Sequence, residues 1–559
     1  MFVRWGVTLL ALAVAVNAAA VPPRPQVLLV GNSSLDTELF GDTLDALRVM
    51  QNEYFESWIG TWPTAIDWTA AVMGTQVAGA LYSLSEGFEA LRTSHIYEFS
   101  MSENLISLYF TQLVSFYFGQ DALSLRAQAY DDMLWVVLGW LDAIKFAKDH
   151  SKAHFEAGPS QRPAQGWYGT TWFPAFAHRA RIFWHLASVG WDTKLCGGGM
   201  NWNPRLMPYK NAITNELYIS ASTAMYLHFP GDDNSSPFIA KGEEPELALN
   251  TNWPPHDPKY RIAALDGHRW LQSSNMTNRQ GLYVDGFHIS GYKPGDDNSG
   301  KKCDERDEMV YTYNQGVLLT GLRHLYTITG EPKYLEEGQQ LIRSTIRATG
   351  WNIESNLPFE NPATAKSFPP WHGLGRAGVL EDACDASGTC SQDAQTFKGI
   401  WMHHFTTFCI PLVERLATMT PGVHTRHVNS HIASCKEYEA WLRHNVNAAR
   451  NTKDRDGKFG MWWTAGLLRD VTAFDLNVVT DVPKPDGATD YRNEGVPNTH
   501  LWVLTPTVSS SEDRKQRPMT RKRDALVSDV NDRGRGRTVE TQSGGLALLR
   551  ALWEISRLP

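Results

Sequence analysis

Two consecutive carboxylates, Asp131 and Asp132, are the residues of this chain whose types and spacing best suit chemistry. They precede a run from Met133 to Leu141 that carries no charge, and a helix that is apolar on every side is expected to be buried. Buried carboxylates are costly unless they are paired or hydrogen-bonded. Glycosyl transfer needs one carboxylate at the anomeric carbon and one protonated acid at the leaving oxygen, and like charges held close together raise one pKa. We therefore expect the pair to divide these two roles.

The same pair also has an ordinary structural interpretation. Aspartate is common at a helix N-cap and in the first helical turn, where a carboxylate faces the positive end of the helix dipole. The dipeptide alone leaves both interpretations open. Neighbouring helical residues point about 100° apart. The spacing therefore does not predict whether the two carboxyl groups lie at the roughly 5 Å separation of retaining enzymes.

Three other segments carry polar groups suited to a sugar site, at residues 197–202, 209–217 and 311–316. Their asparagine, glutamine and tyrosine side chains can donate and accept hydrogen bonds, as hydroxyl recognition requires, and their glycines allow close approach of the backbone to a ligand. Taken one by one, these residues are explained as well by ordinary helix capping.

Two further motifs do not indicate a function. Residues 373–378 match G-x-G-x-x-G, but no strand precedes them, which argues against dinucleotide binding. Residues 230–235 and 294–299 repeat Pro-Gly-Asp-Asp-Asn-Ser without the alternating spacing of a calcium loop, so we expect turns there.

The elements that must position these residues are almost entirely helical. Apolar spacing indicates about twelve helices, near residues 41–58, 64–92, 104–118, 129–149, 172–188, 210–228, 259–274, 309–328, 333–348, 397–418, 427–450 and 541–557. A stop at Thr329-Gly330, followed by Pro332 in the first turn of the next helix, marks a helical hairpin. Six such pairs without a clear linker could form an all-α toroid whose loops surround one cavity. Bundles and solenoids are alternatives that this pattern leaves open.

Composition narrows the possible functions. The chain has 559 residues, of which 42% are hydrophobic, so it can bury one large core or two modest ones. Its net charge of -8 lacks the positive footprint that phosphate binding requires, so nucleic acid is not an expected partner. The 21 tryptophans and 19 tyrosines suit the flat faces of sugars, although most such rings fill cores.

The N-terminus has the pattern of a secretory signal. Arg4 precedes an apolar run from Trp5 to Val16 and then three alanines at 18–20. The run is too short to span a bilayer with ease, and no other stretch of about 18 uncharged apolar residues exists. We therefore expect a signal peptide at residues 1–20, no transmembrane segment, and a secreted protein that is extracellular or associated with a cell wall.

The cysteines agree with an oxidising exterior. Their even number predicts up to three disulfides, with Cys384 near enough to pair with Cys390 and Cys409 with Cys435. The other two are Cys196 and Cys303. Asn-x-Ser/Thr sequons at Asn32, Asn234 and Asn275 fit a glycoprotein.

Residues 21–559 are expected to form a single domain. The segment at about 509–537 differs from the rest because it is rich in serine, arginine, lysine and aspartate, and we expect an exposed charged insertion there. A processing site or a contact with an anionic wall is the less favoured interpretation of this segment.

Several motifs, in order along the chain, resemble those of glycoside hydrolase family 76, the α-1,6-mannanases and related fungal cell-wall enzymes. Tyr130-Asp131-Asp132 resembles the catalytic Asp-Asp motif of that family. Residues 198–202 and 210–216 resemble its Gly-Gly-x-x-Trp and Lys-Asn-Ala-x-x-Asn-Glu elements. Residues 312–316 resemble its Thr-Tyr-Asn-Gln-Gly, and residues 397–400 its Phe-Lys-Gly. The resemblance covers about Trp62 to Trp553, and several motifs in the right order are more specific than one.

The resemblance implies an (α/α)6 toroid of six helical hairpins and a retaining mechanism. Asp131 would be the nucleophile and Asp132 the general acid/base, with no metal or organic cofactor. The implied partner is mannan or an α-1,6-mannooligosaccharide, bound by a monomer. On motif position alone, the residues that line the mannose subsites would be Trp202, Asn211, Asn215, Glu216, Tyr313, Asn314, Gln315 and Lys398, some of which could be purely structural.

The enzyme so implied is a glycosidase of the endo-α-1,6-mannanase type, and two alternatives stay open. A transglycosidase acting on mannose-containing anchor glycans in cell-wall assembly would share the covalent intermediate and differ only in the acceptor. A non-catalytic mannan-binding wall protein would have no need of an acid with a raised pKa, so the paired acids favour an enzyme. Arg550, Glu554 and Arg557 interrupt the last helix, which argues against a C-terminal lipid-anchor signal.

Overall fold

The structure, a computed structural model of the chain, describes residues 34–90, 96–156, 166–234, 253–298, 301–361, 368–412, 419–468, 482–497 and 529–559. The expected signal peptide and residues 509–528 of the expected insertion lie outside this part of the chain. Within it, no helix combines the length and the apolar character that crossing a membrane requires.

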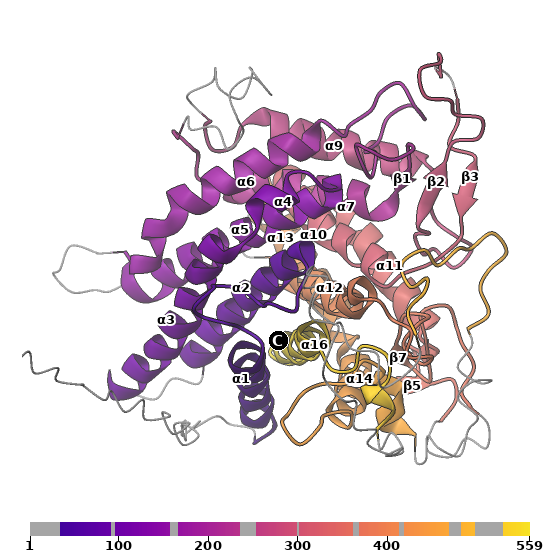
Figure 1. The fold of residues 1–559 in the computed structure, drawn as a ribbon. Coiled ribbons are helices and arrows are strands. Elements are labelled where there is room, and N and C mark those ends of the chain that lie inside the picture. The colour runs from indigo at the N-terminus through magenta and orange to yellow at the C-terminus, as the bar shows by residue number, and fades with distance from the viewer. Residues whose placement is uncertain are drawn as a thin grey trace, which may run out of the picture.

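A closed inner ring of helices forms the centre of the described structure (Figure 1). Each member packs against the next, and the last returns to the first. A helix in such a ring has neighbours on nearly all sides and must be apolar all round, as α7 illustrates, since every residue from 212 to 225 is buried. The ring consists of α2 (Asp67–Ala90), α5 (Tyr130–Ser151), α7 (Ala212–His228), α10 (Val317–Thr329), α12 (Gln392–Cys409) and α16 (Val539–Ser556).

Outer helices alternate with the inner ones along the chain and pack against the outside of the ring. They are α1 (Ser34–Glu53), α3 (Ile96–Gly119), α6 (Phe173–Ser188), α9 (Pro258–Ser273), α11 (Lys333–Ala348) and α14 (Glu439–Arg450), with α4 (Ala122–Leu125) and α13 (Pro421–Lys436) in the connections. An outer helix followed by an inner helix therefore occurs six times in the described residues. This arrangement confirms the predicted (α/α)6 toroid of helical hairpins.

Local sequence signals explain where several helices begin and end. Gly330 closes α10 at a positive φ of 74°, and its N–H donates to the carbonyl of Tyr326 at 2.7 Å, which confirms the hairpin expected before Pro332. Ser391 caps α12 by accepting from the N–H of Ala394, so this helix begins earlier than the expected residue 397. The single helix expected at 427–450 is wrong, because a break near Tyr438 divides it into α13 and α14.

Strands in the described residues are short, as expected. A three-stranded antiparallel sheet in the order β1-β2-β3 pairs Gly286 with Asn211 on one side and with Asp307 on the other. Two small hairpins, β4-β5 and β6-β7, complete the set. The strands are β1 (Lys210–Asn211), β2 (Gly286–His288), β3 (Glu305–Asp307), β4 (Trp351–Asn352), β5 (Leu357–Pro358), β6 (Gly375–Arg376) and β7 (Val379–Leu380). The remaining short helical turns are η1 (Lys152–Glu156), η2 (Tyr168–Trp172), η3 (Tyr313–Gln315), η4 (Trp463–Leu467) and η6 (Val530–Asp532).

Three disulfides fasten connections of the toroid. Both expected pairs are confirmed, Cys384 with Cys390 and Cys409 with Cys435. The third bond joins Cys196, in the loop after α6, to Cys303, just before β3. A bond across 107 residues fixes the glycine-rich loop near the three-stranded sheet.

The C-terminal end of the expected insertion is packed against the toroid. In residues 529–537, the side chain of Arg537 is only 5% exposed and forms ion pairs with Asp529 and Asp532. Its guanidinium also donates to the carbonyl of Thr452 at 2.8 Å. Eight of these nine residues are buried or partly buried, and only Asp532 is exposed, so the expected exposure does not hold for most of this end of the insertion.

The contact between α10 and α12 depends on a glycine. A methyl group at Gly316 would lie 2.7 Å from the backbone Cα of Trp401. We expect Gly316→Ala to lower the free energy of unfolding by about 1–3 kcal/mol because backbone must move. Gly41→Ala, in α1 with nothing within 4 Å, is the matched control and should be neutral or stabilising. Chemical denaturation of both variants measures the difference, and equal stabilities would contradict this packing.

Candidate active site

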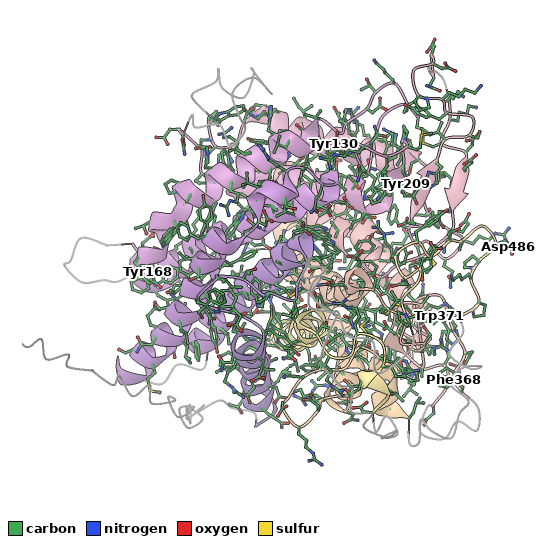
Figure 2. The ribbon with its side chains drawn as sticks, viewed as in Figure 1. Tyr130, Tyr168, Tyr209, Phe368, Trp371 and Asp486 are labelled. Carbon is green, nitrogen blue, oxygen red and sulfur yellow. A yellow bond between two sulfur atoms is a disulfide. The ribbon has the colours of Figure 1, made fainter. Side chains whose placement is uncertain are left out.

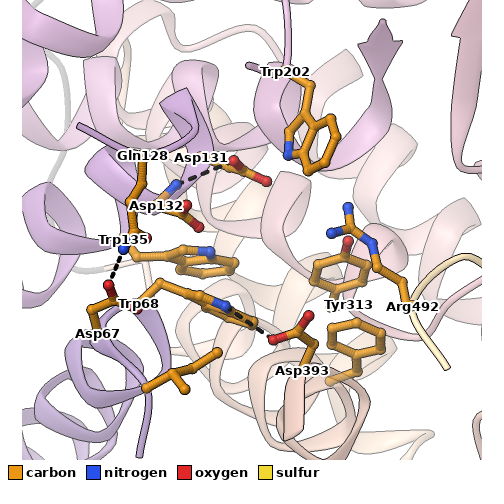
Figure 3. A pocket seen from close by; sticks show the side chains of 12 residues that line it. Asp67, Trp68, Gln128, Asp131, Asp132, Trp135, Trp202, Tyr313, Asp393 and Arg492 are labelled. Atoms are coloured by element: carbon orange, nitrogen blue, oxygen red, sulfur yellow. Dashed lines mark hydrogen bonds between the residues drawn. The ribbon is translucent and has the colours of Figure 1, made fainter. Parts of the chain in front are cut away.

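A pocket of about 190 Å³ lies where the N-terminal ends of inner helices meet (Figure 3). The start of α2, the start of α5, the first turns of α12 and the turn η3 before α10 all contribute to its wall. Helix N-termini favour negative charge, so carboxylates are well placed there. The lining residues are Ile66, Asp67, Trp68, Gln128, Asp131, Asp132, Trp135, Trp202, Tyr313, Asp393, Phe397 and Arg492.

The two expected catalytic acids stand in the first turn of α5. The residue at the N-cap is Ala129, whose N–H donates to the Asp132 carboxylate at 3.1 Å. The N–H of Asp132 in turn donates to the Asp131 carboxylate at 3.2 Å. Tyr130, which precedes the pair, donates its N–H to the carbonyl of Trp202 at 2.9 Å. Asp132 therefore helps to cap the helix while both carboxyl groups line the pocket.

Burial and mutual repulsion separate the two acids electrostatically. Burial raises the pKa of Asp131 to about 6, although the positive charge of Arg492 acts in the opposite direction. The pKa of Asp132 is raised well above its ordinary value by burial and by the negative charge of Asp131. The first proton bound by the pair therefore resides on Asp132, which leaves Asp131 as the ionised member.

Aromatic rings form two walls of the pocket. Trp68 and Trp135 stack with ring centroids 5.8 Å apart, and Trp68 donates from Nε1 to Asp393 at 3.1 Å. Tyr313 stacks on Phe397 at 3.9 Å. Flat rings beside hydrogen-bonding carboxylates match a sugar, which presents apolar C–H faces and hydroxyl edges.

Several of these residues are absent from the set that sequence analysis proposed. Asp67 and Trp68 are the first residues of α2, and Asp393 lies in the first turn of α12. A search for acidic and aromatic residues at the starts of the inner helices could therefore have identified these three. Gln128, whose amide donates to Asp67, and Arg492 stand in irregular segments. No periodicity marks such positions.

Two of the eight expected substrate-binding residues, Trp202 and Tyr313, line the pocket, and the other six do not. Asn211 caps α7 by accepting from the N–H of Thr214 at 3.3 Å. Asn215 accepts from the N–H of Met200 at 2.7 Å and donates to the carbonyl of Asn211 at 2.8 Å. The Asn215 amide therefore holds the glycine-rich loop against α7, while Asn211 caps that helix, and neither side chain lines the pocket.

Gln315 and Lys398 are also engaged inside the protein. Gln315 accepts from the N–H of Tyr283 at 2.8 Å and donates to its carbonyl at 2.8 Å. Lys398 pairs with the buried carboxylate of Asp385 and donates to the carbonyl of Met461 at 3.1 Å. Both side chains fasten loops around the site and lie outside the pocket.

Glu216 and Asn314 are the remaining two expected residues. Both are completely buried, and their side-chain polar atoms have no hydrogen-bond partner among the described residues. Burial raises the pKa of Glu216 well above its ordinary value, which favours the neutral form of this carboxyl group. Neither side chain lines the pocket.

Figure 2 shows how densely side chains fill the space between the helices, with Tyr130 and Tyr209 labelled on the side of the molecule that carries β1. Tyr209 donates its hydroxyl to Asp285 at 2.7 Å and stacks on His288 at 4.2 Å. These contacts join the segment after Trp202 to β2 and so support one side of the pocket.

A cluster of possible metal ligands in the described residues consists of Cys384, Asp385 and Cys390. The two sulfurs form a disulfide, and Asp385 pairs with Lys398. Metal binding by cysteine requires the thiolate, so this cluster does not have the chemistry of a metal site.

The buried pair of Lys398 and Asp385 gives a test of a structural role. We expect Lys398→Met to lower the free energy of unfolding by about 3 kcal/mol, because it leaves a buried carboxylate without its cation. Adding Asp385→Asn should recover much of that loss. Urea unfolding of the single and double variants measures these free energies. A fully stable Lys398→Met protein that no longer binds substrate would instead assign this lysine to the pocket.

Comparison with known proteins relates the chain to carbohydrate-active enzymes. Residues 246–473 match the sequence profile of Glycosyl hydrolase family 76. The mannan endo-1,6-alpha-mannosidase DCW1 of Candida albicans is 22% identical over 292 residues, which cover 50% of this chain and 51% of that protein. The protein of the same name from Saccharomyces cerevisiae is 24% identical over 233 residues, which cover 40% of this chain and 38% of that protein. The matched region thus spans about half or less of these curated relatives.

Among solved structures, Dfg5 from Chaetomium thermophilum in complex with glucosamine has a TM-score of 0.48 and 13% identity, covering 94% of this chain and 92% of that one. The GH76A alpha-1,6-mannanase from Salegentibacter sp. HEL1_6 has a TM-score of 0.44 and 17% identity, covering 92% and 98%. The family profile and the curated relatives confirm that this chain resembles glycoside hydrolase family 76, as its motifs indicated.

Proposed function

We propose that the protein is a retaining glycoside hydrolase that cleaves α-1,6-mannosidic linkages in mannan or mannoprotein glycans. The observation that carries this proposal is the placement of Asp131 and Asp132, two acids with raised pKa values, in one pocket with aromatic walls. The match to the family profile supports the reaction class, and the curated relatives support mannan as the substrate.

The reaction would use the two acids in sequence. Ionised Asp131 attacks the anomeric carbon while Asp132 gives its proton to the leaving oxygen, which forms a glycosyl ester on Asp131. Asp132, now ionised, takes a proton from the attacking water as that water breaks the ester. The stacked rings of Trp68 and Trp135 beside the pair offer an apolar face for the sugar ring.

A transglycosidase acting on anchor glycans in cell-wall assembly is the second candidate. Asp67 and Gln128, joined by a hydrogen bond, line the same pocket as the catalytic pair. Their polar atoms are suited to orient a sugar hydroxyl as an acceptor in place of water. Both candidates fit a secreted glycoprotein at a cell wall.

Products of the wild-type protein with α-1,6-mannooligosaccharides test the reaction. We expect mass spectrometry to show shorter oligosaccharides if water is the acceptor, or longer ones if a sugar is the acceptor. We expect the rate to fall by at least about 10³-fold in Asp131→Asn and in Asp132→Asn. Asp266→Asn, a partly exposed acid on α9 outside the pocket, is the matched control and should keep full activity. Unchanged oligosaccharide with correctly folded wild-type protein would favour the mannan-binding alternative.

The separated acids also predict a pH profile. Asp131 must be ionised, so we expect kcat/KM to fall about tenfold per pH unit below the pKa near 6. Asp132 must be protonated, so activity should also fall as the pH rises through its raised pKa. Asp132→Asn, assayed with an activated aryl mannoside that needs little acid assistance, should lose the basic limb. A profile that is flat from pH 4 to pH 9 would contradict these roles.

A further inference from the structure

One pocket residue, Arg492, comes from an irregular segment beside the pocket. We call residues 482–497 the strap; Asp486, labelled in Figure 2, lies on its outer part. The strap is bonded to β3, since the N–H of Thr489 donates to Asp307 at 3.0 Å. It is bonded further along to Tyr311, whose hydroxyl donates to Asp490 at 2.8 Å.

The far end of the strap is tied to the start of α12. Asn493 accepts at Oδ1 from the N–H of Ser391 at 2.8 Å, and its amide donates to Asp490 at 2.9 Å. Ser391 is the N-cap of α12, two residues before Asp393. Attachments on both sides of Arg492 therefore hold its backbone at a fixed place beside the pocket.

The side chain of Arg492 faces the catalytic pair across the pocket (Figure 3). Its guanidinium lies 5.3 Å from the centre of the Trp202 ring. Arg492 is the positively charged residue among those that line the pocket, which also include four acids. These acids are Asp67, Asp131, Asp132 and Asp393. No ion pair within 4 Å joins Arg492 to a carboxylate in the described part of the chain, so its charge is available to the pocket as a whole.

We infer that Arg492 is a positioning residue for the reaction, whose charge keeps Asp131 ionised for attack while Asp132 retains the proton. This inference rests on the proposed function. The groups that face Asp131 come from several elements: Asp132 on α5, Trp202 in the loop before β1, Tyr313 on η3 and Asp393 on α12. Those that can ionise are acids, and a further acid, Asp285, interacts electrostatically with Arg492.

The physical argument compares the pair with and without the cation. Two neighbouring carboxyl groups removed from water hold one proton readily, and burial favours binding of a second. Arg492 opposes the second proton because it interacts favourably with ionised Asp131. Without Arg492, both acids would be protonated at pH values where the enzyme needs one nucleophile.

Arg492→Met and Arg492→Lys test this role through pH dependence. We expect Arg492→Met to move the acid limb of the kcat/KM profile upward by about 1 pH unit and so to lower kcat/KM at pH 6 by about fivefold. Arg492→Lys keeps the charge and should restore most of the wild-type limb. Arg205→Met, an exposed arginine near Trp202, is the matched control and should leave the profile unchanged.

A second measurement needs no substrate. Water-soluble carbodiimide with an amine modifies protonated carboxyl groups, and tandem mass spectrometry of the peptide assigns modification to Asp131 as a function of pH. The midpoint should rise by about 1 pH unit in Arg492→Met and not in Arg492→Lys. An unchanged midpoint, or equal effects of the two variants, would overturn the inference. A shifted midpoint in a protein that cleaves no mannooligosaccharide would show that Arg492 controls the ionisation of Asp131 but would reject both the proposed function and the role of Arg492 in that reaction.

Discussion

The desolvated pair of carboxyl groups at the start of α5 is the constraint on which the rest of the site depends. Water cannot stabilise both charges there, so the protein must supply substitutes. Backbone N–H groups of Ala129 and Asp132 donate to the two carboxylates, and the positive end of α5 adds to their effect. Arg492 and Trp202 also stabilise ionised Asp131, whereas the charge of Asp131 raises the pKa of Asp132, so the site favours an ionised Asp131 beside a protonated Asp132.

A closed ring makes this arrangement possible because it holds several helix starts at one end. Near the pocket, Glu540 of α16 accepts from Thr69 of α2 at 3.2 Å and from Gln392 of α12 at 2.8 Å. One buried carboxylate thus joins three neighbouring inner helices, directly beside Trp68 and Asp393. The last helix of the chain therefore closes the ring and supports the aromatic and acidic wall at the same time.

Sequence patterns predicted the fold well because the inner and outer helices have strong apolar signals and clear punctuation. The hairpin at Gly330 and the two disulfides that join near neighbours follow from local chemistry. The place of the two acids at the start of a buried helix was also predictable, since they precede an uncharged apolar run. The charged composition of residues 529–537 predicted an exposed segment, but the side chain of Arg537 is buried and paired with Asp529 and Asp532 of the same segment.

The rest of the site was harder to predict because motif residues serve two purposes that sequence does not separate. Asn215 and Gln315 look like sugar ligands, but each satisfies backbone groups of a loop that has no regular partner. Arg492 lies far along the chain from the other lining residues, in a segment without periodicity, and only the tertiary structure brings it to the pair.

Direct trapping of the covalent intermediate tests the central claim that Asp131 attacks and Asp132 assists. Asp132→Asn protein can be incubated with an activated mannosyl fluoride, whose leaving group needs no acid, so that the ester forms and then persists for lack of a base. The account predicts one mannosyl adduct by intact mass spectrometry, located on Asp131 by peptide sequencing. An adduct on a different residue, or turnover of the fluoride without any adduct in a folded protein, would contradict it.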